Sequence, residues 1–129
     1  MGPVETAIRK AVKKGDRLFT PSKPEPFWVG EISVERIVLE LGTKRTKTPI
    51  EWGCIEGILP FIKKHGRIRI NGSYRSQRIV EGTLDGYLKK YVNRVTAGWI
   101  AALLEKAGVV VIDRSRPAYV RANDAFILD

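Results

Sequence analysis

The chain is organised around GTLDGYLKKYVNRVTAGWIAALLEKAGVVVIDRSRPAYVRA, residues 82–122. Five apolar residues in the first part of this stretch follow the i, i+3, i+4, i+7, i+8 spacing of one helical stripe: Leu84, Tyr87, Leu88, Tyr91 and Val92. Thr83 precedes them, in the position where a side-chain oxygen caps a helix. The spacing therefore predicts a short amphipathic helix that begins after Thr83.

A second apolar stripe follows after a very short turn. Its members are Trp99, Ile100, Leu103, Leu104 and Ala107. Thr96 is placed to accept the first unpaired backbone N–H groups of this helix, and Gly108 is placed to end it. Only Asn93–Val95 separates the two helices, so the predicted geometry is a helix-turn-helix.

The residues after the second helix predict a β-hairpin. Val109–Ile112 is rich in β-branched residues, and turn-forming residues follow at 113–117. The chain then returns through Tyr119 and Val120. We expect this hairpin to form a wing beside the two helices.

Residues 48–82 predict a further helix, a short strand and a loop. The sequence Thr48-Pro49-Ile50-Glu51 has the form of a capping box with proline at the first helical position, so we expect a helix to begin here. Its apolar face would run as far as Lys64, weakened or kinked by Gly53, Gly57 and Pro60, through Ile50, Cys54, Ile55, Ile58, Leu59 and Ile62. The alternation in Arg67–Ile70 predicts a strand, and Asn71–Gly82 predicts a polar loop.

In chain order, residues 48–122 give helix, strand, helix, turn, helix, strand, wing and strand. This order resembles the winged helix-turn-helix family of DNA-binding proteins, over roughly three fifths of the chain. The resemblance implies that the helix Thr96–Ala107 enters the major groove and that the wing tip, Arg114–Pro117, touches the DNA backbone or minor groove.

One feature departs from the family pattern, because the expected outward face of the second helix is small: Ala97, Gly98, Ala101, Ala102 and Glu105. Such side chains cannot make bidentate contacts with bases. Two interpretations stay open. Either the helix sits close to the groove, with Asn93, Arg94 and Thr96 contacting phosphates and bases, or another protein packs on this face.

Residues 1–47 predict an N-terminal helix followed by a small antiparallel β subdomain. Val4–Val12 has helical spacing and Gly15 follows as a stop. Strands are expected at Arg17–Thr20, Phe27–Ile32 and Arg36–Leu41, and Gly42–Lys47 is expected to be an exposed basic loop. The subdomain would extend the winged-helix sheet, form a separate lobe or make a homodimer interface. In the tail, residues 123–129, Phe126, Ile127 and Leu128 would add an edge strand or dock on the core.

The charge balance points to a polyanionic partner. Lys and Arg number 23 against 14 Asp and Glu, which gives a formal net charge of +9. Nine cations lie between Phe61 and Arg94, where the acids are Glu81 and Asp85. The predicted DNA contacts are Lys44, Arg45, Arg75, Arg78, Lys89, Lys90, Asn93, Arg94, Thr96, Arg114, Arg116 and Arg121.

Catalytic and metal sites are not expected. His65 is the single histidine and Cys54 the single cysteine, and neither has a second ligand at metal-binding spacing. The carboxylates are scattered, and the sequence contains neither a Gly-rich phosphate loop nor a Ser-His-Asp set. We therefore predict no enzyme activity, no cofactor and no small-molecule substrate. Trp28, Trp52 and Trp99 are expected in the core, and Tyr74 and Tyr119 at the surface among basic neighbours.

The sequence thus predicts an α+β protein: a winged helix-turn-helix domain (48–122) with an N-terminal helix and small antiparallel β subdomain (1–47). The predicted function is binding of double-stranded DNA, as a small transcriptional regulator or as the recognition module of a restriction or mobile-element system. The alternative is a protein-interaction or RNA-binding module that uses the Ala-rich helix face. No apolar run approaches the roughly 20 residues needed to span a bilayer, so we expect no membrane partner and favour a cytoplasmic location.

Overall fold

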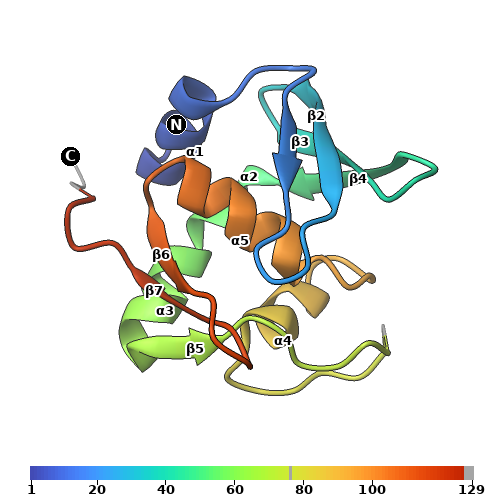
Figure 1. Ribbon diagram of the computed structural model, residues 1–129. Helices are drawn as coiled ribbons and strands as arrows, with labels where there is room; N and C mark the ends of the chain where they lie inside the picture. The colour runs from blue at the N-terminus through green and yellow to red at the C-terminus, as the bar shows by residue number, and fades with distance from the viewer. Residues whose placement is uncertain (76, 127–129) are drawn as a thin grey trace.

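Two antiparallel sheets lie on either side of a central helix in the computed structural model, which describes residues 1–75 and 77–126 (Figure 1). The first sheet has four strands in the order β1-β2-β3-β4, and the second has three in the order β5-β7-β6. The fold class is therefore mixed α+β, as expected. Buried apolar residues from both halves of the chain form one hydrophobic core.

The N-terminal half contains helix α1 (Pro3–Ala11) and the four-stranded meander. Its strands are β1 (Arg17–Phe19), β2 (Pro26–Ile32), β3 (Arg36–Leu41) and β4 (Thr46–Glu51). Alternate residues of β2 and β3 face the core, because successive side chains of a strand point to opposite faces: Phe27, Val29, Ile37, Leu39 and Leu41 are all buried. The three strands predicted in this region are confirmed.

The helix start expected at Thr48 is wrong, because Thr48–Glu51 belongs to β4. Ile37 pairs with Ile50 and Val38 with Pro49, so β4 covers the open edge of β3. Proline is tolerated because β4 is an edge strand. The basic loop is correspondingly shorter than expected, and the boundary predicted between residues 47 and 48 falls inside the strand.

The helical stripe that follows is split in two. Helix α2 (Trp52–Glu56) and helix α3 (Ile58–His65) meet at Gly57, where a kink is predicted. The apolar face is nevertheless confirmed, since its members after Ile50 are buried: Cys54, Ile55, Ile58, Leu59 and Ile62.

The C-terminal half follows the predicted order of elements. These are β5 (Arg67–Arg69), α4 (Leu84–Lys89), α5 (Ala97–Lys106), β6 (Val110–Asp113) and β7 (Tyr119–Ala122). Thr83 caps α4 as expected, because its Oγ1 accepts a hydrogen bond from Gly86 N at 2.9 Å. Thr96 does not cap α5 through its side chain. Helix α4 ends before Tyr91, which is 61% exposed, so the first apolar stripe is shorter than predicted.

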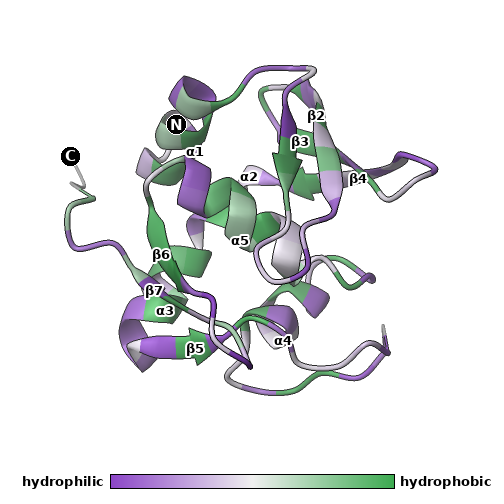
Figure 2. Cartoon of the chain, viewed as in Figure 1, coloured by the Kyte–Doolittle hydropathy of each residue, from purple (hydrophilic) through white to green (hydrophobic). Residues whose placement is uncertain are grey.

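Helix α5 is buried on nearly all sides, including the face expected to point outward. Ala97, Ile100, Ala101 and Leu103 are each 0% exposed. The helix contacts α1 and β1 on one side and β6 and α4 on the other. Figure 2 shows it as a largely hydrophobic helix at the centre of the molecule. The small residues are explained by packing within the chain, because they let the N-terminal half approach the helix axis.

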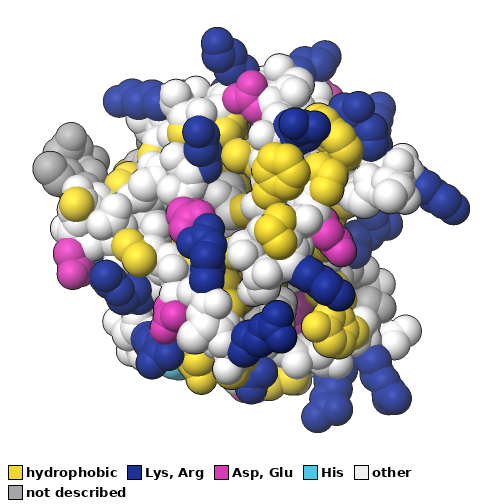
Figure 3. All heavy atoms as spheres, viewed as in Figure 1, with side chains coloured by type: hydrophobic (Ala, Val, Ile, Leu, Met, Phe, Trp, Pro, Cys, Tyr) yellow, Lys and Arg dark blue, Asp and Glu magenta, His cyan; other side chains and the backbone are white. Residues whose placement is uncertain are grey.

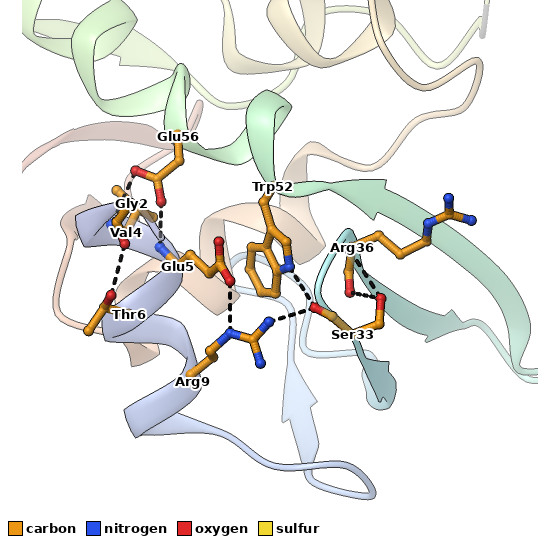
Figure 4. A network of polar contacts seen from close by, with 9 residues as sticks. All are labelled: Gly2, Val4, Glu5, Thr6, Arg9, Ser33, Arg36, Trp52 and Glu56. Atoms are coloured by element: carbon orange, nitrogen blue, oxygen red, sulfur yellow. Dashed lines mark hydrogen bonds and ion pairs between the residues drawn. The ribbon is translucent and has the colours of Figure 1, made fainter.

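A polar network joins α1 to the meander and to α2 (Figure 4). The Glu56 carboxylate accepts hydrogen bonds from Val4 N at 3.2 Å and Glu5 N at 2.6 Å, at the start of α1. Arg9 donates to Glu5 and to the Ser33 carbonyl, which also accepts a bond from Trp52 Nε1 at 2.9 Å. The N-terminal half is therefore tied to the helices that follow it.

The C-terminal tail docks on the core through Phe126, which is half-buried against it. Ile127 and Leu128 lie outside the described residues. Within the ranges 1–75 and 77–126, the helices are too short or too polar to cross a bilayer.

Candidate nucleic-acid interface

The outer face of the β5-β7-β6 sheet carries arginines. Arg67 pairs with Arg121 and Arg69 with Tyr119, so all four side chains lie on one face. Their neighbours Ile68 and Val120, with Ile112 of β6, are buried on the opposite face. Apolar residues on the inner face thus force the cations outward, because strand side chains alternate.

Arg67 is held in place on this face by two contacts. Its guanidinium carbon lies 3.9 Å from the centroid of the Tyr119 ring, and its Nη2 lies 3.4 Å from Asp113 Oδ2. More than half of the side chain stays exposed. The guanidinium is therefore oriented by an aromatic face and a carboxylate while its remaining donors face solvent.

The turn between β6 and β7, residues 114–118, adds two more arginines. Arg114 donates to both carboxylate oxygens of Glu105, at 2.7 and 2.6 Å, which ties this turn to the end of α5. Ser115 N donates to Asp113 Oδ1 at 3.0 Å. Hydrogen bonds from Ser115, with a smaller contribution from Arg67, lower the pKa of Asp113. Arg116 is exposed beside them.

The loop after β5 leaves the sheet at the same end as this turn, since Ile70 N donates to Ala118 O at 3.1 Å. It carries Arg75 and Arg78, both exposed. Lys89 holds it from beneath: its Nζ donates to the carbonyls of Ser73, Arg75 and Arg78 at 2.7, 2.8 and 2.9 Å. The Lys89 side chain is fully buried, so Lys89 is removed from the predicted DNA contacts.

These residues define a surface that we call the arginine surface. It comprises the seven exposed arginines Arg67, Arg69, Arg75, Arg78, Arg114, Arg116 and Arg121. Figure 3 shows Lys and Arg side chains along the lower edge of the molecule, where Figure 1 places β5, the loop after it and the β6–β7 turn. Among the described residues, only three of the seven have an acidic partner, namely Arg67, Arg114 and Arg121.

Three other predicted contacts lie outside the sheet face and the two segments that define this surface. Lys44 and Arg45 lie in the turn between β3 and β4, which projects from the far side of the meander in Figure 1. Arg45 is paired with Glu40 at 2.9 Å and lies over the Trp28 ring at 4.2 Å. Lys90 is exposed and paired with Glu81 at 3.2 Å.

The turn motif and the wing lie near opposite ends of α5. Arg94 Nη1 donates to Thr48 Oγ1 at 3.2 Å, so Arg94 contacts the first sheet just before α5 begins. Arg114 instead contacts Glu105 near the end of α5, about 12 Å further along the helix at ~1.5 Å per residue. Asn93 is exposed beside Arg94, whereas Thr96 is 0% exposed and cannot contact DNA in this arrangement.

Insertion of α5 into a major groove is also prevented, because α1 and β1 cover the helix. The same packing occupies the Ala-rich face that a protein partner is alternatively predicted to use. Sequence reasoning missed Arg67 and Arg69 as site residues, although the alternation of RIRI, residues 67–70, was a signal that could have found them.

No known protein family, curated protein or solved structure matches the chain.

Proposed function

We propose that this protein binds double-stranded DNA through contacts between the arginine surface and the phosphates. The single observation that carries the proposal is the sheet face of Arg67, Arg69 and Arg121, continued by the arginines of the adjoining turn and loop. Arginine suits this role because its planar guanidinium makes paired hydrogen bonds to phosphate oxygens.

We further propose that residues 52–122 form a winged-helix domain whose wing has kept a DNA-binding role. The order of elements supports this, as does the placement of β7 between β5 and β6. In this proposal the N-terminal half has taken the place that DNA would occupy along α5. Because α5 is unavailable for base contacts, we expect binding with little sequence preference.

Fluorescence anisotropy with a labelled random-sequence duplex, measured at several salt concentrations, tests the proposal. Each arginine that neutralises a phosphate should contribute about 0.9 to the slope of log affinity against log salt. The double variant Arg69→Ala with Arg116→Ala should therefore bind more weakly and reduce that slope by about 2. Neither arginine has an acidic partner among the described residues, so the folded state should be little affected.

The double variant Lys44→Ala with Lys47→Ala is the matched control, because it removes the same charge from two exposed positions of the β3–β4 hairpin. We expect its affinity and salt slope to equal those of the unmodified protein. The proposal fails if no duplex binding is measurable at low salt. It also fails if this control loses as much affinity as the variant of Arg69 and Arg116, since net charge alone would then explain binding.

A further inference from the structure

We infer that a cavity beside the arginine surface binds one unpaired nucleobase of the bound nucleic acid, an inference that rests on the proposed function. The cavity has a volume of about 390 Å³. Three segments far apart in sequence line it: residues 20–25 after β1, residues 70–74 after β5 and residues 95–99 at the start of α5. Figure 1 shows the β1–β2 loop descending beside α5 toward the loop after β5.

The lining suits a flat, uncharged ring. Ile70, Val95 and Trp99 supply apolar and aromatic surface, and Tyr74 stands at the rim with 91% of its surface exposed. Polar groups that can hydrogen-bond the edge of a base come from Ser22 and Asn71. Bases bind single-stranded sites by stacking on aromatic side chains, with polar groups at their edges.

Charge separates this cavity from its surroundings. The positive charge of Lys23 and the negative charge of Glu25 cancel in the lining, so the cavity carries no net charge. Positive charge lies just outside it, because Arg75 follows Tyr74 directly in the chain. A neutral base would therefore enter the cavity while its phosphate stays outside, next to the arginine surface. A free phosphate or a carboxylate would find no net positive charge inside.

The rim is held before any ligand arrives. The carbonyls of Ser73 and Arg75, on either side of Tyr74, both accept hydrogen bonds from the buried Lys89 ammonium. The backbone that carries the Tyr74 ring is thus fixed, which lowers the entropy lost when a base stacks on it. The volume lies at the lower end of the range for ligand pockets and is large enough for one ring system.

The test compares a blunt duplex with the same duplex carrying one unpaired 5-iodouracil at a 3′ end. We expect about tenfold tighter binding of the second duplex, as one stacked base provides. Ultraviolet crosslinking should attach the base to the peptide that contains Tyr74 or Trp99. Tyr74→Ala should abolish the preference and leave affinity for the blunt duplex within twofold.

Tyr91→Ala is the control, because Tyr91 is also an exposed tyrosine but does not line the cavity. It should retain the preference. Equal affinity for the two duplexes, with no crosslink to residues 70–74 or 95–99, would overturn the inference while leaving duplex binding intact. If neither duplex binds, the proposed function fails as well. The inference would also be overturned if a free mononucleotide, at the same concentration as the duplex, displaced the unpaired base. The cavity would then be a site for free nucleotides.

Discussion

Lys89 and Asp85 form a buried ion pair. The distance from Lys89 Nζ to Asp85 Oδ2 is 2.8 Å, and the two side chains are 0% and 1% exposed. Asp85 Oδ2 also accepts a hydrogen bond from Ser73 N at 3.0 Å. Both members of the pair therefore bind the backbone of the loop that carries Tyr74, Arg75 and Arg78, so one turn of α4 determines how this loop is presented.

Removal of the ammonium should both destabilise the protein and release the loop. Lys89→Met leaves the Asp85 carboxylate buried and uncompensated, and the expected loss of unfolding free energy is about 3–5 kcal/mol. Urea denaturation measures this loss. The double variant Lys89→Met with Asp85→Asn should recover part of it, because no buried charge remains. Hydrogen exchange of the amides of residues 73–75 should be faster in both variants than in the unmodified protein. Unchanged protection there would show that Lys89 does not hold the loop.

Gly86 and Gly53 should respond in opposite ways to alanine. A Cβ at Gly86 would overlap the backbone oxygen of Val80, which cannot shift without moving the chain, so Gly86→Ala should cost about 1–3 kcal/mol. A Cβ at Gly53 meets nothing within 4 Å among the described atoms. Gly53→Ala should therefore stabilise α2 by up to ~1 kcal/mol. Thermal unfolding of the two variants checks the pair, and equal effects would contradict this account of α4 packing.

The Cys54 thiol should react slowly and make the fold sensitive to alkali. Burial, with a smaller effect from Glu51, raises the pKa of Cys54 to about 11. At pH 8 only ~0.1% of this thiol is then thiolate, so alkylation of the folded protein should be about a hundredfold slower than alkylation of the unfolded chain. Mass spectrometry of iodoacetamide adducts, with and without urea, measures the ratio.

The same shift implies a loss of stability between about pH 9 and pH 11. In that range the unfolded chain releases the thiol proton and the folded protein keeps it, so unfolding becomes more favourable as pH rises. Burial also raises the pKa of Tyr87, whose hydroxyl donates to Cys54 O at 2.7 Å, and this acts in the same direction. Cys54→Ala should show a shallower decline; an identical decline would exclude the thiol as its source.

Glu105→Gln should strengthen DNA binding if the proposed function holds. The Arg114–Glu105 pair is partly exposed, so its loss should cost no more than about 1 kcal/mol of stability. The variant frees the Arg114 guanidinium for phosphate and removes one negative charge beside the arginine surface. Affinity for a random duplex should rise severalfold at low salt. Glu31→Gln, at an exposed carboxylate on the first sheet, is the charge-matched control. Its affinity for the duplex should rise less.

Local signals predicted most elements of the fold and failed where an element depends on distant partners. The alternation in Phe27–Ile32 and Arg36–Leu41 was sufficient, because one buried face specifies a strand. The capping signal at Thr48–Glu51 was misleading, because pairing with β3 along the whole of β4 outweighs two hydrogen bonds at a helix end. A local preference for helix predicts secondary structure only weakly, because tertiary contacts often override it.

For the candidate site, the sequence alone determined the excess of positive charge and the hairpin that carries Arg114 and Arg116. Only the tertiary structure decided which cations are usable. It buried Lys89 as a loop support and turned Arg94 toward β4, while β5 and β7 placed Arg67 and Arg121 side by side. The physical reason is that charge and periodicity are local properties of a chain, whereas burial and neighbourhood arise when distant segments compete for the same core.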